Sequence, residues 1–157
     1  MNSPSKNTGR KAVAARSSAG LQGSIGLLRT ISPDALDKAF ARVGQALREG
    51  LSKEAEKILT NTIEGYRHSD DDLANLKRLL SFTLETVGNY KESLEIVKPF
   101  EDEVVLGRLK METQVRVTTQ LAIAYSNLAD QPKAVTLLKE TLKQAQENDL
   151  ARLSGIV

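Results

Sequence analysis

The chain has no cysteine, no tryptophan and a single histidine among its 157 residues. Without cysteine it can form no disulfide framework, no thiolate metal site and no cysteine nucleophile, which is compatible with a reducing compartment. No apolar run reaches the roughly 18 residues that a transmembrane helix needs, and no apolar signal-peptide core follows Met1. These absences predict a protein without a membrane span, and we expect it in the cytoplasm.

Aromatic residues are also scarce, at 4%, whereas apolar residues reach 40% and are mostly Ala, Leu, Val and Ile. Small and aliphatic side chains suit close helix–helix packing better than the core of a sheet sandwich. A chain of this length can form one domain with one continuous core. The composition therefore favours a single helical domain.

The net charge of +2 is too small to indicate a nucleic-acid partner, but its distribution is uneven. Residues 1–33 contain five basic side chains and no acid, while the rest of the chain holds 17 basic and 20 acidic side chains. A basic tail therefore precedes a mildly acidic body. The five basic residues of the tail are Lys6, Arg10, Lys11, Arg16 and Arg29.

Residues 1–31 are predicted to form this tail. Residues 1–20 have too few apolar side chains to offset the entropy of ordering them, which predicts disorder, and residues 21–31 are predicted to form a short turn over the first helix pair. Two alternatives remain open. Residues 1–30 are rich in Arg and Ser and free of acids, as in a transit peptide, which would place the protein in an organelle matrix. The tail could also contact nucleic acid or an anionic membrane.

Three stretches share one pattern, in which two apolar helical segments flank a break: residues 43–59, 81–97 and 122–138. Gly50, Gly88 and Ala129 close the first helix of each pair. The second helix then carries a small residue and, four positions later, a large apolar one. These positions hold Ala55 and Leu59, Ser93 and Val97, and Ala134 and Leu138. Such repetition predicts a helical-repeat architecture and favours a binding surface over catalysis.

Capping signals delimit the first three predicted helices. Ser32 precedes Pro33 and begins a helix that runs to about residue 48. Ser52 is predicted to cap a second helix that ends near Gly65. Ser69 and the three acids at 70–72 form a capping box for a third helix, which runs to about residue 87.

Three further helices are predicted in the second half of the chain. Asn89 and Glu92 begin the fourth, which Pro99 must kink or end, and residues 104–106 either resume the helix or form a loop. The fifth runs from about Met111 to residue 128. The segment 130–132 opens the sixth.

Residues 115–148 resemble a tetratricopeptide repeat (TPR), a motif that places small residues where its two helices cross and large ones around the crossing. The matching positions are Leu121, Ala122, Tyr125, Ala129, Ala134 and Leu138. Residues 74–107 match at Leu80, Ser81, Leu84, Gly88, Tyr90, Ser93 and Val97, and residues 36–69 at Val43, Gly50, Ala55 and Leu59. The alanine that the motif expects late in the second helix is replaced by Thr62, Phe100 or Thr141.

The repeat spacing is 38 residues from Ala55 to Ser93 and 41 from Ser93 to Ala134, longer than the 34 residues of the TPR family. The chain therefore resembles the long-repeat variety found in bacterial regulators and scaffold proteins. The resemblance implies an all-α, right-handed superhelical solenoid of about three TPR-like helix-turn-helix repeats over residues 32–149. Residues 150–157 would then be a C-terminal cap or the start of a truncated fourth repeat.

Catalytic and metal-binding constellations are missing from the sequence. His68 is expected to be a solvent-exposed loop residue, and Asp70–Asp72 point around a helix rather than converging on a cation. No Ser/His/Asp set, paired histidines or phosphate-binding loop is present. We therefore expect no enzymatic activity, no metal and no cofactor.

The resemblance implies that the first helix of each repeat lines a concave groove that binds a peptide or a partner domain. The predicted groove residues are Phe40, Leu47, Asn75, Arg78, Phe82, Glu85, Arg116, Thr119, Ile123 and Asn127. Phe82 with Arg78 and Arg116 offers an apolar anchor beside two cations, which suits a peptide with an apolar residue and an acidic group. The family's carboxylate-clamp positions hold Phe40 and Gly44 here, so a chaperone tail is not the expected ligand.

The expected function is that of an adaptor or regulatory module for protein–protein interaction. One alternative is a homo-oligomeric scaffold that associates through the ends of its repeats. Another is nucleic-acid or membrane association through the basic tail.

Overall fold

The computed structural model describes residues 27–148, and these residues are almost entirely helical. Their elements are α2 (Pro33–Arg48), α3 (Ser52–Gly65), α4 (Asp70–Thr86), α5 (Tyr90–Val97), the 3₁₀-helix η1 (Lys98–Glu101), α6 (Glu103–Gly107), α7 (Met111–Asn127) and α8 (Gln131–Glu147). Between residues 27 and 148 no strand forms, and the only β-type pairing is an isolated bridge between Thr30 and Arg67. The predicted all-α class is confirmed.

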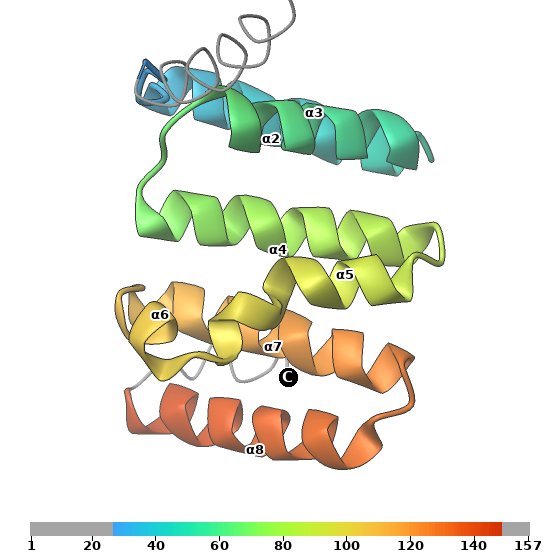
Figure 1. Ribbon diagram of the computed structural model, residues 1–157, viewed down its shortest axis with the longest axis vertical. Helices are drawn as coiled ribbons and strands as arrows, with labels where there is room; N and C mark the ends of the chain where they lie inside the picture. Colours follow the sequence, from blue (N-terminus) through green and yellow to red (C-terminus); the bar gives the residue numbers. More distant parts are fainter. Residues whose placement is uncertain (1–26, 149–157) are drawn as a thin grey trace, which may run out of the picture.

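The helices lie across the long axis of the molecule, with α2 and α3 at one end and α8 at the other (Figure 1). Consecutive helices pack against each other in the pairs α2–α3, α4–α5 and α7–α8. The pairs are joined by packing of α3 on α4, and of both α4 and α5 on α7. Each pair therefore buries its apolar stripes mainly against its neighbours in the chain.

The helices α2, α4 and α7 end in the same hydrogen-bonded turn. A left-handed residue follows each helix, and the amide after it donates to the carbonyl five residues earlier, which is the pattern of a Schellman motif. These amide–carbonyl pairs are Leu51 and Ala46 at 2.8 Å, Asn89 and Leu84 at 2.9 Å, and Asp130 and Tyr125 at 3.0 Å. The left-handed residues are Gly50 (φ +74°), Gly88 (φ +80°) and Ala129 (φ +65°). The prediction that these three positions close the first helix of each pair is confirmed.

Side-chain capping agrees with the predictions at α2, α4 and α8 only. The hydroxyl of Ser32 accepts from the amide of Ala35, and that of Ser69 accepts from the amide of Asp72. Ser52 was expected to cap α3, but Leu51 occupies the cap position and Ser52 is the first helical residue. The side chain of Leu51 has no oxygen that could accept from the first amides of α3, whereas Asp130, at the equivalent position before α8, accepts from the amide of Lys133.

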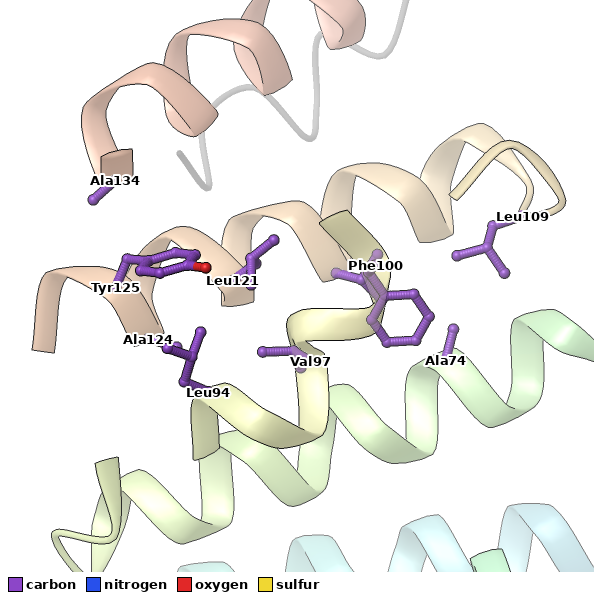
Figure 2. Packing of buried hydrophobic residues seen from close by; sticks show 10 residues of the cluster. Ala74, Leu94, Val97, Phe100, Leu109, Leu121, Ala124, Tyr125 and Ala134 are labelled. Atoms are coloured by element: carbon purple, nitrogen blue, oxygen red, sulfur yellow. The ribbon is translucent and has the colours of Figure 1, made fainter. Parts of the chain in front are cut away.

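Pro99 ends the regular part of the fourth predicted helix. The chain passes from α5 into η1, which contains Pro99, and then into α6, where Asp102 accepts from the amides of Val104 and Val105. This detour turns the buried Phe100 into the core between α4 and α7 (Figure 2). Residues 104–106 thus form a short helix, and the detour accounts for the length of this repeat.

Small residues lie where paired helices cross. Ala55 and Ser93 are completely buried, and Ala134 is 2% exposed. In the α4–α5 pair both crossing residues are serines, and the hydroxyls of Ser81 and Ser93 lie 2.8 Å apart in a hydrogen bond. The buried Thr62 donates its hydroxyl to its own helix, at the carbonyl of Ile58, 2.7 Å away. Polar side chains can therefore replace alanine at these positions without leaving a buried hydroxyl unpaired.

Residues ahead of α2 belong to the folded part of the chain. Ile31 is buried in the first core cluster, and its amide donates to the carbonyl of Arg67 at 3.0 Å. The guanidinium of Arg67 in turn donates to the carbonyl of Leu28. The segment 28–31, which the prediction assigned to the tail, therefore pairs with the connection between α3 and α4. Residues 1–26 and 150–157, to which the disordered tail and the terminal cap were assigned, lie outside the described residues.

A polar cluster joins η1 to the last two helices. The Lys133 ammonium lies 2.7 Å from a carboxylate oxygen of Glu101 and 2.8 Å from the Tyr125 hydroxyl, which also donates to Glu101. The same ammonium lies 4.2 Å from the centroid of the Tyr125 ring. The hydrogen bond to Glu101, followed by that to Tyr125, raises the pKa of Lys133 above its ordinary value. Figure 2 shows the Tyr125 ring in the layer between α5 and α8, so this cluster has a structural role.

Candidate functional site

Two parallel stripes of predicted groove residues lie on packed helices. Asn75, Arg78, Phe82 and Glu85 recur at intervals of three or four residues and share one face of α4. Arg116, Thr119, Ile123 and Asn127 do the same on α7. Because α4 packs directly on α7, the two stripes form one surface, which we call the α4–α7 face.

The α4–α7 face contains a cation with no counterion among residues 27–148. Arg78 is half-buried, and its Nε is buried without a hydrogen-bond partner. Among residues 27–148 no carboxylate lies within ion-pair distance of it. Burial lowers the pKa of Arg78, and the positive charge of Arg116 lowers it further. The charge of Arg78 is thus partly desolvated and repelled, so an anion placed there would be strongly favoured.

Arg116 differs from Arg78 both in its exposure to solvent and in having an ion-pair partner. It is exposed, and its guanidinium lies 2.6 Å from the carboxylate of Glu112 on the same helix. An ion pair of this kind contributes little to stability and is easily exchanged for another partner. Arg116 can therefore turn toward an anion that Arg78 already holds.

Apolar side chains are exposed beside these cations. Phe82 of α4 is 43% exposed and Ile123 of α7 is 41% exposed. Phe82 lies about one helical turn from Arg78 on α4, and Ile123 lies about two turns from Arg116 on α7. The α4–α7 face therefore combines exposed apolar surface with positive charge.

Glu85 is half-buried and is bound to a network of buried polar side chains. Its carboxylate accepts from Ser93 and from Gln120, each at 3.0 Å, and Gln120 also donates to Ser81 at 3.2 Å. Burial raises the pKa of Glu85, and the hydrogen bonds from Ser93 and Gln120 partly offset this rise. Asn127 lies near enough to favour the ionised form as well. The network ties α4, α5 and α7 together at one end of the α4–α7 face.

Other predicted groove residues serve mainly the structure. Phe40 and Leu47 pack against the first core cluster from α2. Thr119 is 9% exposed, and its hydroxyl donates to the carbonyl of Val115. Asn75 donates its side-chain amide to the carbonyl of Asp71, while its own side-chain oxygen is buried without a partner. Of these, only Asn75 has an unused polar atom next to Arg78.

His68 lies in the loop between α3 and α4 as expected, but it is half-buried, so the expectation that it is solvent-exposed is wrong. Its Nε2 lies 2.8 Å from the carbonyl of Thr62 at the end of α3, and its Nδ1 is buried without a partner. The connection from α3 to α4 folds back over the helix end, which sequence alone did not indicate. The acids nearby have other partners, since Asp72 accepts from the hydroxyl of the capping Ser69 and Asp71 accepts from the amide of Lys110 ahead of α7. No group of three metal-ligating side chains converges within residues 27–148.

A basic hollow between α2 and α3 was not foreseen. It has a volume of about 600 Å³, and Lys38, Arg42, Lys53 and Lys57 lie along it. The signal was present in the sequence, because these residues form two pairs of cations four positions apart. Only the packing of α2 on α3 reveals that both pairs border the same hollow.

Comparison with protein-family models gives no match for this chain, and no curated protein matches it. Within the described residues, no helix has the length and apolar character needed to cross a membrane.

Proposed function

We propose that this protein is a TPR-like helical-repeat module that binds an extended peptide of a partner protein on its α4–α7 face. The architecture proposed is a right-handed solenoid of three helix pairs. Its support is the recurrence of one left-handed turn at Gly50, Gly88 and Ala129, together with buried small residues at the helix crossings. A stack of such pairs presents a long surface suited to extended ligands.

The observation that carries the binding proposal is the isolated charge of Arg78. A half-buried guanidinium that has no counterion within the described residues and lies next to a second arginine costs folding free energy. A ligand carboxylate can relieve this cost and accept hydrogen bonds from Arg78, while Phe82 and Ile123 contact an apolar ligand side chain. The proposed ligand is therefore a peptide with an acidic group near a large apolar residue, and the protein acts as an adaptor or regulatory module.

The test is selection from a random peptide library displayed on phage, with the full chain as bait. Selected peptides are synthesised, and their Kd is measured by fluorescence polarisation against wild type, Arg78→Met and Phe82→Ala. Each variant is expected to weaken binding about tenfold, which corresponds to about 1.4 kcal/mol. Methionine keeps most of the length of the arginine side chain, so Arg78→Met removes the charge without leaving a large cavity.

Two control variants match these changes at other places. Tyr90 is 41% exposed, close to the exposure of Phe82, so Tyr90→Ala removes a comparable aromatic ring from α5. Arg108→Met removes an exposed arginine near α6. Both controls should leave the Kd unchanged within about twofold. If no peptide is selected, or if the selected peptides bind Arg78→Met and Phe82→Ala as tightly as wild type, the proposal is wrong.

A second candidate function is self-association through the end of the helical stack. Leu138 of α8 is only half-buried, whereas Leu59 and Val97 at the equivalent positions of α3 and α5 are completely buried. Val135, one turn before Leu138, is 46% exposed. Light scattering should then give a dimer mass for wild type and a monomer mass for Val135→Arg. A monomeric wild-type protein would exclude this candidate.

A further inference from the structure

The hollow between α2 and α3 concentrates positive charge in a domain that is otherwise acidic. Residues 27–148 hold 17 basic and 19 acidic side chains. Four of the basic ones, Lys38, Arg42, Lys53 and Lys57, line this one hollow, and Glu54 is the only acid among its lining residues. No lining residue belongs to the α4–α7 face, so the hollow is a separate feature of the molecule.

The four cations form two pairs of like charges, one on each helix. Lys38 and Arg42 lie four residues apart on α2, as do Lys53 and Lys57 on α3, so the members of each pair face the same way. Like charges at this spacing destabilise a helix by a few tenths of a kcal/mol per pair. Of these four cations, only Lys38 has an ion-pair partner within the described part of the chain, the exposed Asp34 at 2.8 Å. The charges of the other three are available to a ligand.

The hollow also has features that suit an elongated ligand with apolar parts. Its floor includes the half-buried Ala39 and Ile58, and Tyr66 at its edge is 41% exposed. The hydroxyl of Thr62 is already bonded to the carbonyl of Ile58 and adds no free donor. A second hollow of about 460 Å³ shares Lys53 and Lys57 with the first, so the cavity continues along α3.

These features favour a peptide over a nucleic acid. A nucleic acid carries a phosphate at every nucleotide and would bring some of them against Glu54 and Glu56, whereas a peptide can carry acids only where the cations lie. A single exposed aromatic ring also offers little stacking surface for bases. A peptide can place its acidic residues against Arg42, Lys53 and Lys57 and an apolar residue on the floor. We propose that the hollow between α2 and α3 is a second binding site, which holds an acidic peptide segment of a partner protein.

The test uses the full chain and three fluorescein-labelled probes in fluorescence polarisation. The first probe is a Glu/Asp-rich peptide of about ten residues with a central Leu, which spans roughly 33 Å when extended. The second is the same peptide with Gln and Asn in place of the acids. The third is single-stranded DNA of similar length. The acidic peptide is expected to bind more tightly than the other two, with an affinity that falls between about 50 mM and about 300 mM NaCl as screening increases.

The Arg42→Gln/Lys57→Gln variant removes one cation from each helix at the hollow and should raise the Kd of the acidic peptide about tenfold. The matched control is Lys139→Gln/Lys143→Gln on α8, which removes the same charge from exposed residues at i, i+4 spacing. The control should change the Kd by less than about twofold. Residues 1–26 are identical in both variants, so binding by their basic side chains affects both equally.

Two results would overturn the proposal. The first is an equal loss of affinity in both variants, which would show that only net charge matters. The second is binding of DNA, or of the Gln/Asn peptide, as tight as binding of the acidic peptide. The melting temperature of the hollow variant is measured as well, and it should equal or exceed that of wild type because repulsion between like charges is relieved. Titration of isotope-labelled protein with the acidic peptide should change the amide chemical shifts of Asn61 and Tyr66, which line the hollow.

Discussion

Replacement of the three residues with positive φ tests the turn on which the repeat depends. Gly50, Gly88 and Ala129 occupy equivalent positions with φ between +65° and +80°. An L-residue in this left-handed conformation costs about 1–2 kcal/mol, because Cβ approaches the following carbonyl. Alanine offsets about 0.4–1 kcal/mol of this cost relative to glycine, because its backbone has less conformational entropy in the unfolded chain and so loses less on folding. The net preference for glycine is therefore about 0.5–1 kcal/mol at each turn.

The surroundings do not complicate this estimate. A Cβ added at Gly50 or Gly88 would meet no atom within 4 Å, so substitution by alanine tests backbone conformation without a clash. We expect Gly50→Ala and Gly88→Ala each to destabilise the protein by about 0.5–1 kcal/mol, and Ala129→Gly to stabilise it by a similar amount. For a chain of this size, such changes shift Tm by about 1–4 °C.

Gly65 is the matched control. A Cβ at Gly65 also has open space around it, but this residue ends α3 without a positive φ. Gly65→Ala should therefore be neutral or stabilising by up to about 1 kcal/mol. Urea unfolding followed by circular dichroism gives the free energy of unfolding of all four variants. If Gly50→Ala and Gly88→Ala are as harmless as Gly65→Ala, or if Ala129→Gly destabilises the protein, backbone strain is not what selects these residues.

Three further predictions concern packing and charge. Ala134→Leu should overpack the crossing of α7 and α8 and destabilise the protein by about 1–3 kcal/mol in urea unfolding, whereas Val135→Leu on the exposed side of α8 should change it by less than about 0.5 kcal/mol. Glu85 has a raised pKa in the folded state, so its contribution to stability is greatest below its unfolded pKa and is lost as pH rises through the folded pKa. Glu85→Gln should therefore be more stable than wild type at neutral pH and should flatten the change in unfolding free energy between acidic and neutral pH; an unchanged pH profile would contradict this. Lys133→Met should lower stability by at most about 1 kcal/mol, because the ion pair with Glu101 is partly exposed, and the loss should shrink in high salt.

Local signals in the sequence were sufficient for most of the helices. The boundaries of α2, α4, α7 and α8 follow from caps, from turn residues and from apolar periodicity, all of which act within a few residues. Ser52 and His68 departed from expectation because each depends on how one helix connects to the next. Leu51, directly after the turn at Gly50, takes the cap position, so Ser52 is already the first residue of α3. The imidazole of His68 is hydrogen-bonded to the carbonyl of Thr62.

For the candidate sites too, some features could be predicted from local sequence and others depended on tertiary packing. The spacing of Arg78 and Phe82 on one helix face could be read from the sequence, because helical periodicity alone determines which residues share a face. Whether a side chain on that face is available was decided by tertiary packing. Glu85 is enclosed by Ser93 and Gln120, which lie 8 and 35 residues away in the chain.

The sequence by itself determined the all-helical class, the repeated helix pairs and their left-handed turns, because these arise from interactions between residues close together in the chain. Only the tertiary structure decided which charges lost their water and which gained a partner. Arg78 lost solvent without gaining a counterion from the part of the chain that the structure describes, and the cations of α2 and α3 came together around one hollow. Desolvation and charge proximity depend on distances between helices, and no local pattern in the sequence encodes them directly.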